Sequence, residues 1–330
     1  AAGAGDRVRR EAARGRVPGG RRAAAGTGRT DGSLSVEVAL AATLAEALPA
    51  LVPDAPAATG RVRLEGRLAT RPGPADPRFE GRLEASGAEV AGWPIERLEA
   101  SVEFTDGALV VPEATARDAY GDEATFAGRL AFPLEEGGWV RARIAVPRLA
   151  RTLDRAGAGV DLPDDLSAEA TVRLEGTLDR LASEISVAVA GHEVRLDVRL
   201  SGELADRTSW TGTIEDLAGR WRGHEGRSGG PAAFRLAGKD LEVAGLVLSA
   251  SGATARVDGI ARLDAGTFEA RAAVAGLTVE LAREFLPPGS IPPAEEFAAA
   301  ASAEVAASGP FEAPRGEVRV LAPRRAWRGR

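Results

Sequence analysis

The sequence of 330 residues contains no cysteine and no methionine, and aromatic residues make up only 5% of it. The absence of cysteine excludes disulfide bonds and thiolate metal sites. Because aromatics are few, Ala, Val and Leu must supply most of the buried surface, and a hydrophobic content of 44% is sufficient for a sizeable core. The formal net charge of −6 argues against nucleic-acid binding, which normally requires a basic surface.

The sequence also lacks an uninterrupted apolar run of 18 residues and a secretory leader, and it begins with Ala1. We therefore expect a piece of a longer protein, with any membrane anchor or targeting signal outside it. Residues 1–33 are rich in Arg, Gly and Ala and show no apolar periodicity. This basic segment is expected to be a disordered linker, and a contact with anionic lipid or RNA is the alternative.

Groups that commonly carry catalysis are sparse. The two histidines, His192 and His224, each lie beside glycine and glutamate and are expected at exposed strand ends. The P-loop motif and the H-E-x-x-H zinc motif are absent. The acid pairs 135–136 and 164–165 lie in turn-like contexts, and the five tryptophans are too scattered to form a stacking platform. We expect no catalytic residue, metal or cofactor, and hence not an enzyme.

The dominant pattern is an alternation of apolar and polar residues with period two, which recurs from about residue 60 to residue 322. The stretch RVRLEGRLATRPGPADPRFEGRLEASG (61–87) contains two such alternations, in which Arg and Glu occupy every second position. Strands buried on both faces would instead be continuously apolar. The alternation therefore predicts an all-β fold with an antiparallel sheet that has one dry face. Together with the longer repeats and the groove interpretation given below, it leads us to expect that this sheet is elongated and curled.

The sequence also contains longer repeats, each of which includes several predicted strands. Three segments, 42–60, 147–166 and 277–297, combine a short helical pattern with prolines, and each leads into a strand that is expected to end in glycine at Gly66, Gly176 or Gly309. We predict one repetitive array over 34–330, with repeats at about 42–146, 147–276 and 277–330, the third of them cut off. Short helices are expected at the junctions between repeats.

The apolar face admits two interpretations. It could be the inside of a compact β-sandwich, or it could line the concave side of a curled sheet, as a groove that accepts acyl chains. The Arg and Glu face would then be convex and face water, with charges paired across strands. The residues predicted to line the groove are Val62, Leu64, Phe79, Leu83, Phe126, Leu130, Val172, Leu174, Val187, Val194, Leu196, Val257, Phe268 and Val318.

The order of these elements resembles a known family. A helix-proline segment, a strand, a turn and FEGRLEA (79–85) are followed by LEASVEFTDGALVV (98–111) and ATFAGRLAF (124–132), and a similar arrangement returns at 240–277. The pattern is similar to that of the TamB and AsmA-like envelope proteins over about residues 34–325. The resemblance implies a taco-shaped β-groove in the periplasm, anchored in the inner membrane by a segment outside this sequence.

The same resemblance implies a non-enzymatic function: conducting phospholipids between the inner and outer membranes, or supporting outer-membrane protein assembly. The implied partners are phospholipid acyl chains and an outer-membrane β-barrel protein. A compact β-sandwich adhesin or structural surface protein is the alternative from a second class. A carbohydrate-active β-helix enzyme is a third, and it would require clustered carboxylates on one exposed face.

Overall fold

The computed structural model describes residues 9–17, 20–28, 34–45, 57–70, 77–90, 93–133, 136–155, 162–177, 180–205, 209–221, 223–278, 301–311 and 313–321. Every strand pairing within its two compact units is antiparallel, so the predicted all-β class with an antiparallel sheet is confirmed. Unit 1 comprises 1–145 and 171–178, and unit 2 comprises 146–170 and 179–330. The repeat boundaries themselves stay a prediction.

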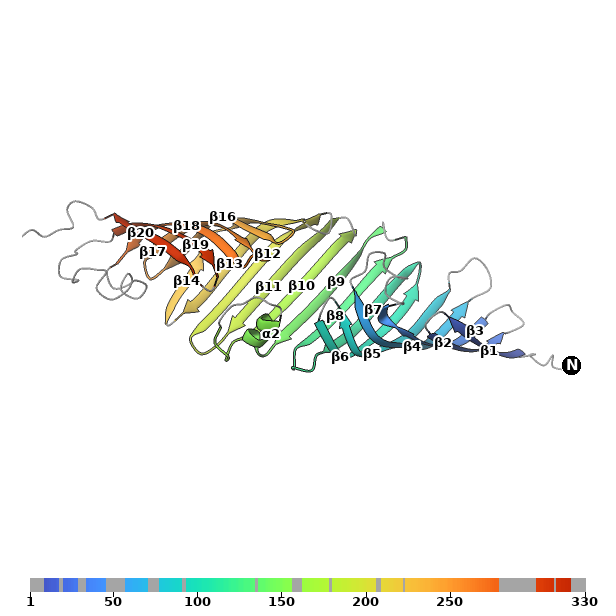
Figure 1. Ribbon diagram of the computed structural model, residues 1–330. Coiled ribbons are helices and arrows are strands. Elements are labelled where there is room, and N and C mark those ends of the chain that lie inside the picture. The colour runs from blue at the N-terminus through green and yellow to red at the C-terminus, as the bar shows by residue number, and fades with distance from the viewer. Residues whose placement is uncertain are drawn as a thin grey trace, which may run out of the picture. The chain divides into compact units, whose positions relative to one another are not determined.

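Unit 1 is built of successive antiparallel strands, each hydrogen-bonded to the next one along the chain (Figure 1, blue to green). Its strands are β1 (Arg9–Val17), β2 (Gly20–Gly28), β3 (Leu34–Thr43), β4 (Ala58–Thr70), β5 (Arg78–Val90), β6 (Trp93–Thr105), β7 (Ala108–Arg117), β8 (Glu123–Ala131) and β9 (Gly138–Val146). Tight turns join several of them. One is the Asp106-Gly107 turn between β6 and β7, where both residues have positive φ, of 51° and 68°, as a two-residue hairpin turn requires.

Unit 2 follows the same plan with one branch (Figure 1, yellow to red). Its strands are β11 (Arg180–Ala190), β12 (Val194–Ala205), β13 (Ser209–Trp221), β14 (His224–Ser228), β15 (Ala232–Ala237), β16 (Asp240–Ala250), β17 (Ala253–Arg262), β18 (Thr267–Leu277), β19 (Ala301–Pro310) and β20 (Arg315–Leu321). The long strand β13 pairs with β14 along one half and with β15 along the other, and both short strands then pair with β16. The strand β10 (Ser167–Thr177) contributes residues to both units.

One of the three predicted junction helices falls within the described residues. The helix α2 (Leu149–Arg155) lies inside the proline-bearing segment 147–166. The Leu149 N–H donates to the carbonyl oxygen of Leu166 at 2.8 Å, and the side chains of Thr152 and Leu166 are buried beside it. Arg155 lies in the last turn, where a cation complements the helix dipole. Residues 46–56 and 279–297 of the other two segments lie outside the described residues.

Two sequence expectations differ from the structure. The basic segment 1–33 was expected to be a linker, but residues 9–17 and 20–28 form β1 and β2, which extend the hydrogen-bonded ladder from β3. Backbone pairing with an existing edge strand does not require an alternating apolar pattern, so β1 and β2 have no periodic signature in the sequence. Gly66 does not end its strand either, because β4 continues to Thr70. Gly176 and Gly309 do lie next to the last residue of their strands.

Each unit contains a line of register shifts across neighbouring strands. In unit 1 the pairing shifts between Ala100 and Glu103 and again between Val111 and Ala114, and we call this line the unit 1 crease. An extra residue in one strand bends that strand and increases its twist. The bend explains why side chains from one face of the sheet come into contact with one another here.

The corresponding line in unit 2 runs from β12 to β17 and is called the unit 2 crease. The pairing shifts between Arg199 and Leu200 and between Val243 and Leu246. Between these two shifts, β14 ends at Ser228 and β15 begins only at Ala232. In the gap, the N–H of Gly229 donates to the carbonyl oxygen of Val247 at 2.8 Å. The branch of β13 is therefore part of the same bend.

Candidate functional site: the apolar faces of the two units

The apolar residues of unit 1 lie in continuous rows that cross its strands. Residues directly opposite each other in antiparallel strands point to the same face, so the register determines each row. One row, from β3 to β9, contains Leu40, Leu64, Leu83, Ala100, Ala114, Phe126 and Ala142. A second contains Val36, Leu68, Phe79, Phe104, Leu109 and Leu130. The predicted residues Val62, Leu64, Phe79, Leu83, Phe126 and Leu130 therefore share one face.

Unit 2 has rows of the same kind. One runs from β16 to β20 through Leu246, Val257, Ala272, Val305 and Val318. Another runs from β12 to β19 through Leu204, Trp210, Leu236, Leu241, Ala261, Phe268 and Gly309. The remaining predicted residues of unit 2 fall on this same face, since Val187 pairs with Val198, and Val194 and Leu196 alternate along β12.

The predicted residues are partly accessible to solvent. All of them are half-buried except Val318, which is 42% exposed. Val172 and Leu174 are the half-buried members of an alternation along β10, in which Arg173 is exposed. In a β-sandwich core such side chains would be fully buried against a second sheet, whereas the described strands of each unit belong to one sheet. The rows are therefore incompletely covered by the described residues.

Each crease holds a contiguous cluster of buried apolar side chains. The unit 1 crease holds Ala100, Val102 and Ala114, with Leu83 and Phe126 among the half-buried side chains packed against them. The unit 2 crease holds a buried cluster of larger side chains, and these are Ile214, Ala232, Phe234 and Leu246. In both units the buried cluster at the crease supplies a core on the apolar face. The sequence analysis did not single out either cluster.

Aromatic rings cover glycines on neighbouring strands of this face. A Cβ added at Gly66 or at Gly81 would lie 2.6 Å from Cζ of Phe79, so the Phe79 ring occupies the space above both glycines. In unit 2, a Cβ at Gly202 would lie 2.7 Å from Nε1 of Trp210. This arrangement restores the contacts that a glycine pair would otherwise lack, and it explains why Gly66 is tolerated inside a strand.

Trp210 is held in place by hydrogen bonds as well as by packing. Its indole Nε1–H donates to Oγ of Ser183 at 2.7 Å, and that hydroxyl donates to the carbonyl oxygen of Gly202 at 3.0 Å. The Trp210 ring also meets Phe234 edge to face, with 4.6 Å between the ring centroids. Trp210 is therefore a packing residue, as the sequence suggested. Trp93 is 45% exposed, and Trp139 lies under the guanidinium of Arg141.

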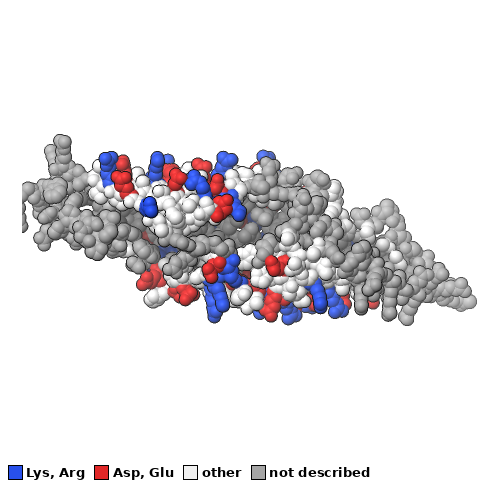
Figure 2. Space-filling view, in the orientation of Figure 1, with Lys and Arg blue, Asp and Glu red and all other residues white. Residues whose placement is uncertain are grey.

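The opposite face of each sheet carries the charged residues. Figure 2 shows Arg and Lys side chains next to Asp and Glu side chains on the face drawn, rather than gathered by sign. Several pairs join neighbouring strands, as predicted, including Arg82 with Glu99 at 2.6 Å and Arg117 with Glu123 at 2.8 Å. The hydrogen bond that Arg117 donates to the Glu123 carboxylate is the main cause that raises the pKa of Arg117 above its ordinary value. Such exposed pairs add solubility more than stability.

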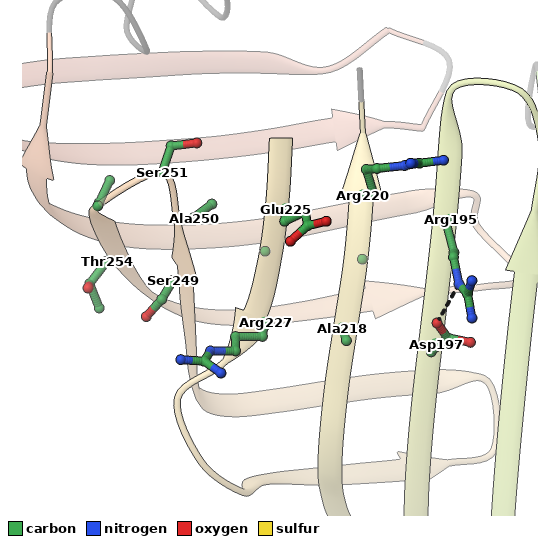
Figure 3. A pocket seen from close by; sticks show the side chains of 14 residues that line it. Arg195, Asp197, Ala218, Arg220, Glu225, Arg227, Ser249, Ala250, Ser251 and Thr254 are labelled. Atoms are coloured by element: carbon green, nitrogen blue, oxygen red, sulfur yellow. Dashed lines mark hydrogen bonds and ion pairs between the residues drawn. The ribbon is translucent and has the colours of Figure 1, made fainter. Parts of the chain in front are cut away.

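The charged face of unit 2 contains two open depressions. The first, of about 700 Å³, is lined by residues of β12, β13, β14, β16 and β17 (Figure 3). The second, of about 470 Å³, is lined by residues of β17, β18, β19 and β20. The charged lining residues of both depressions alternate with the row residues along each strand, and Ala272 and Val305 of one row also border the second depression.

The remaining groups with catalytic potential are solvent-facing or already engaged. His192 lies in an exposed turn, where its backbone N–H donates to Asp165 Oδ2 at 2.6 Å, and His224 begins β14 with its Nδ1 3.0 Å from Ser251 Oγ. Among the described residues, no group of three His, Asp or Glu side chains could hold a metal ion. Glu135 and Trp327 lie outside those residues.

Residues 226–230, GRSGG, fit the G-x-S-x-G pattern of serine hydrolases by their letters, a match that the sequence analysis did not pick out. In those enzymes the serine occupies a sharp turn between a strand and a helix. Here Ser228 is the last residue of a β-strand, and its Oγ accepts a hydrogen bond from the N–H of Leu217 at 3.0 Å. The structural context of a nucleophile is therefore missing.

Comparison with known proteins gave no match: no protein-family model, no curated protein and no solved structure matches the chain. In the described part of the chain, no helix has the length and apolar character needed to span a membrane. The apolar rows are accordingly the feature on which a functional interpretation has to be built.

Proposed function

We propose that the chain is a non-enzymatic segment of a bacterial envelope protein whose apolar faces bind phospholipid acyl chains. In this proposal the segment conducts lipids between the inner and outer membranes, or supports the assembly of outer-membrane proteins, with an outer-membrane β-barrel protein as partner. It would lie in the periplasm, as part of a longer protein anchored in the inner membrane. The observation that supports the proposal is the set of half-buried apolar rows on one face of each sheet.

The chemistry of these rows suits a flexible hydrocarbon. They consist almost entirely of Ala, Val, Leu and Phe, so they offer dispersion contacts without a hydrogen-bonding group that would select a particular ligand. Each CH₂ group removed from water contributes about 0.8 kcal/mol. An acyl chain lying on a row would therefore be favoured, and it could slide because no single contact dominates.

The dimensions of a row also fit. The row from Leu40 to Ala142 crosses the strands β3 to β9. At about 4.8 Å between neighbouring strands, the contour of this row is about 29 Å long. A single acyl chain spans about half of a bilayer core of about 30 Å, so the row is longer than one chain. An acyl chain can therefore move along this surface from one strand to the next, as a conduit requires.

The proposal can be tested by photo-crosslinking with neighbouring residues as controls. A benzophenone amino acid at Leu64 or Val187 would project from the apolar face, whereas the same group at Arg63 or Ala188 would project from the charged face of the same strand. After irradiation with phospholipid vesicles, we expect lipid adducts by mass spectrometry at the first two positions only. Equal yields on both faces, or no adducts, would contradict the proposal.

A second variant checks that the rows act through their apolar character. Replacing Leu64 and Leu174 by Asp places carboxylates at two half-buried positions without cutting into a crease. We expect lipid crosslinking to disappear while the circular-dichroism signal of the β-sheet remains. The matched control is Arg63→Asp, which adds negative charge on the other face and should leave crosslinking unchanged. Solution scattering distinguishes the alternative, since a β-sandwich would be a compact particle.

A further inference from the structure

The larger depression on the charged face of unit 2 is lined by more arginines than carboxylates. It is lined by Arg195, Arg220 and Arg227 against two carboxylates, Asp197 and Glu225. Its volume of about 700 Å³ lies within the range of small-molecule sites. The surplus cation and the volume together indicate space for a negatively charged group.

The register brings two of these cations directly opposite each other. Arg195 of β12 pairs with Arg220 of β13, and like charges at opposite positions are destabilising unless something neutralises them. Asp197 engages Arg195 at 3.0 Å, which leaves Arg220 without that carboxylate. Within the described residues, neither Arg220 nor Arg227 forms an ion pair, although Glu225 is the register partner of Arg220.

The two arginines without an ion pair among the described residues extend in opposite directions across the depression (Figure 3). In Figure 3, Arg220 extends toward the strand that carries Arg195, and Arg227 extends toward Ser249. Ser249 is directly opposite Arg227, and Thr254 is directly opposite Ser249, so hydroxyl groups continue the row beyond the arginines. Guanidinium groups bind phosphate oxygens through paired N–H donors, and hydroxyls supply additional donors.

The second depression is a comparison site built by the same fold. There two of the three arginines have a carboxylate in the opposite register position: Asp258 is opposite Arg271, and Glu304 is opposite Arg319. Three arginines, the third being Arg256, face three carboxylates, so no cation is in surplus. The two depressions therefore differ in charge balance although they share a face and an architecture.

We propose that the depression around Arg220 and Arg227 binds a phosphate group. The group can belong to a phospholipid headgroup or to a soluble phosphate compound. This site lies on the face opposite the apolar rows, so it goes beyond the lipid-conduit proposal and does not depend on it. Glu225 lowers the affinity of the site for phosphate, because its carboxylate repels an anion that approaches Arg220.

The test compares two variants that remove the same amount of charge from the same face. Arg220→Gln with Arg227→Gln alters the proposed site, and Arg256→Gln with Arg271→Gln alters the comparison site. Binding of inorganic phosphate is measured by titration calorimetry at low salt. Binding to phosphatidylglycerol vesicles, with phosphatidylcholine as control, is measured by cosedimentation. We expect the first variant to weaken binding about tenfold or more and the second to leave it nearly unchanged.

The outcomes separate the sources and the proposals. Binding of inorganic phosphate identifies a site for soluble phosphate compounds, and binding of anionic vesicles alone identifies a headgroup site. Glu225→Gln should tighten whichever binding is found. The proposal is overturned if the unaltered protein binds neither probe, or if both double variants lose binding equally. Photo-crosslinking at Leu64 is expected to be the same in both double variants, so failure here leaves the lipid-conduit proposal standing.

Discussion

Both creases combine register shifts with a buried apolar cluster, but the two clusters are filled by side chains of different size. The unit 1 crease is closed by small side chains, with Ala114 only 1% exposed beside Ala100. The unit 2 crease is filled by Ile214, Phe234 and Leu246, and one of its strands is interrupted to make room. A bend can thus be stabilised either by close backbone approach or by large side chains, and the two solutions should respond oppositely to changes in side-chain volume.

Removing volume from the unit 2 crease should have the largest effect. Phe234→Ala deletes a ring that is 6% exposed and packs against Trp210, so we expect a loss of about 3 kcal/mol in the free energy of unfolding. Urea denaturation measures the loss, and hydrogen exchange should place it in β13 to β16. Phe126→Ala is the control, because Phe126 is only half-buried at the unit 1 crease and should cost less. Equal losses would remove the distinction between the creases.

Adding volume to the unit 1 crease should come next. Ala114→Leu inserts three carbons where Ala114 is directly opposite Ala100 and Phe126, and we expect about 2 kcal/mol of destabilisation from overpacking. Hydrogen exchange in β6 to β8 reports the effect. Ala188→Leu, at an exposed position of the charged face, should change stability by less than about 0.5 kcal/mol. A neutral Ala114→Leu would mean that the bend does not depend on close backbone approach.

The smallest effect concerns the polar support of the unit 2 crease. Ser183→Ala removes the acceptor of the Trp210 indole N–H and the donor to Gly202, and we expect a loss of about 1 kcal/mol. The near-ultraviolet circular dichroism of Trp210 should change as well, because the ring is no longer fixed. Ser186→Ala, at an exposed position of the same strand, is the control and should change neither measurement. An unchanged spectrum in Ser183→Ala would indicate that packing against Phe234 alone orients the ring.

The sequence was informative about faces and less so about boundaries. Side chains alternate between the two faces of a strand whatever its partner is, so the alternation around Leu64 and Val257 assigned both to the apolar face correctly. It could not show that β4 continues through Gly66, because the reason lies on β5, where the Phe79 ring covers that glycine. It also could not show β1 and β2, since their pairing is a matter of backbone hydrogen bonds.

The candidate site was predictable to the same extent. Every predicted row residue lies in a described strand, and the registers place those of β4 to β8 and of β11 to β20 on the apolar face of their unit. The arginine-lined depression was not predictable, because Arg195, Arg220 and Arg227 are ordinary members of three separate alternations. The register that sets Arg195 opposite Arg220 becomes visible only once the strands are paired, as does the similar juxtaposition of Arg97 and Arg117 in unit 1.

The sequence by itself determined the antiparallel all-β fold and the apolar face of the strands, because a period of two in hydrophobicity matches the period of two in side-chain direction. The tertiary structure decided where the sheets bend, which side chains become buried, and which charges meet. Bulges and the branch of β13 are local departures from that period, and their position depends on hydrogen bonds between strands far apart in sequence. The hydrophobic pattern along the chain specifies which face of a strand each side chain occupies. The curvature of a sheet and the cross-strand partner of each residue are defined only once the strands are paired.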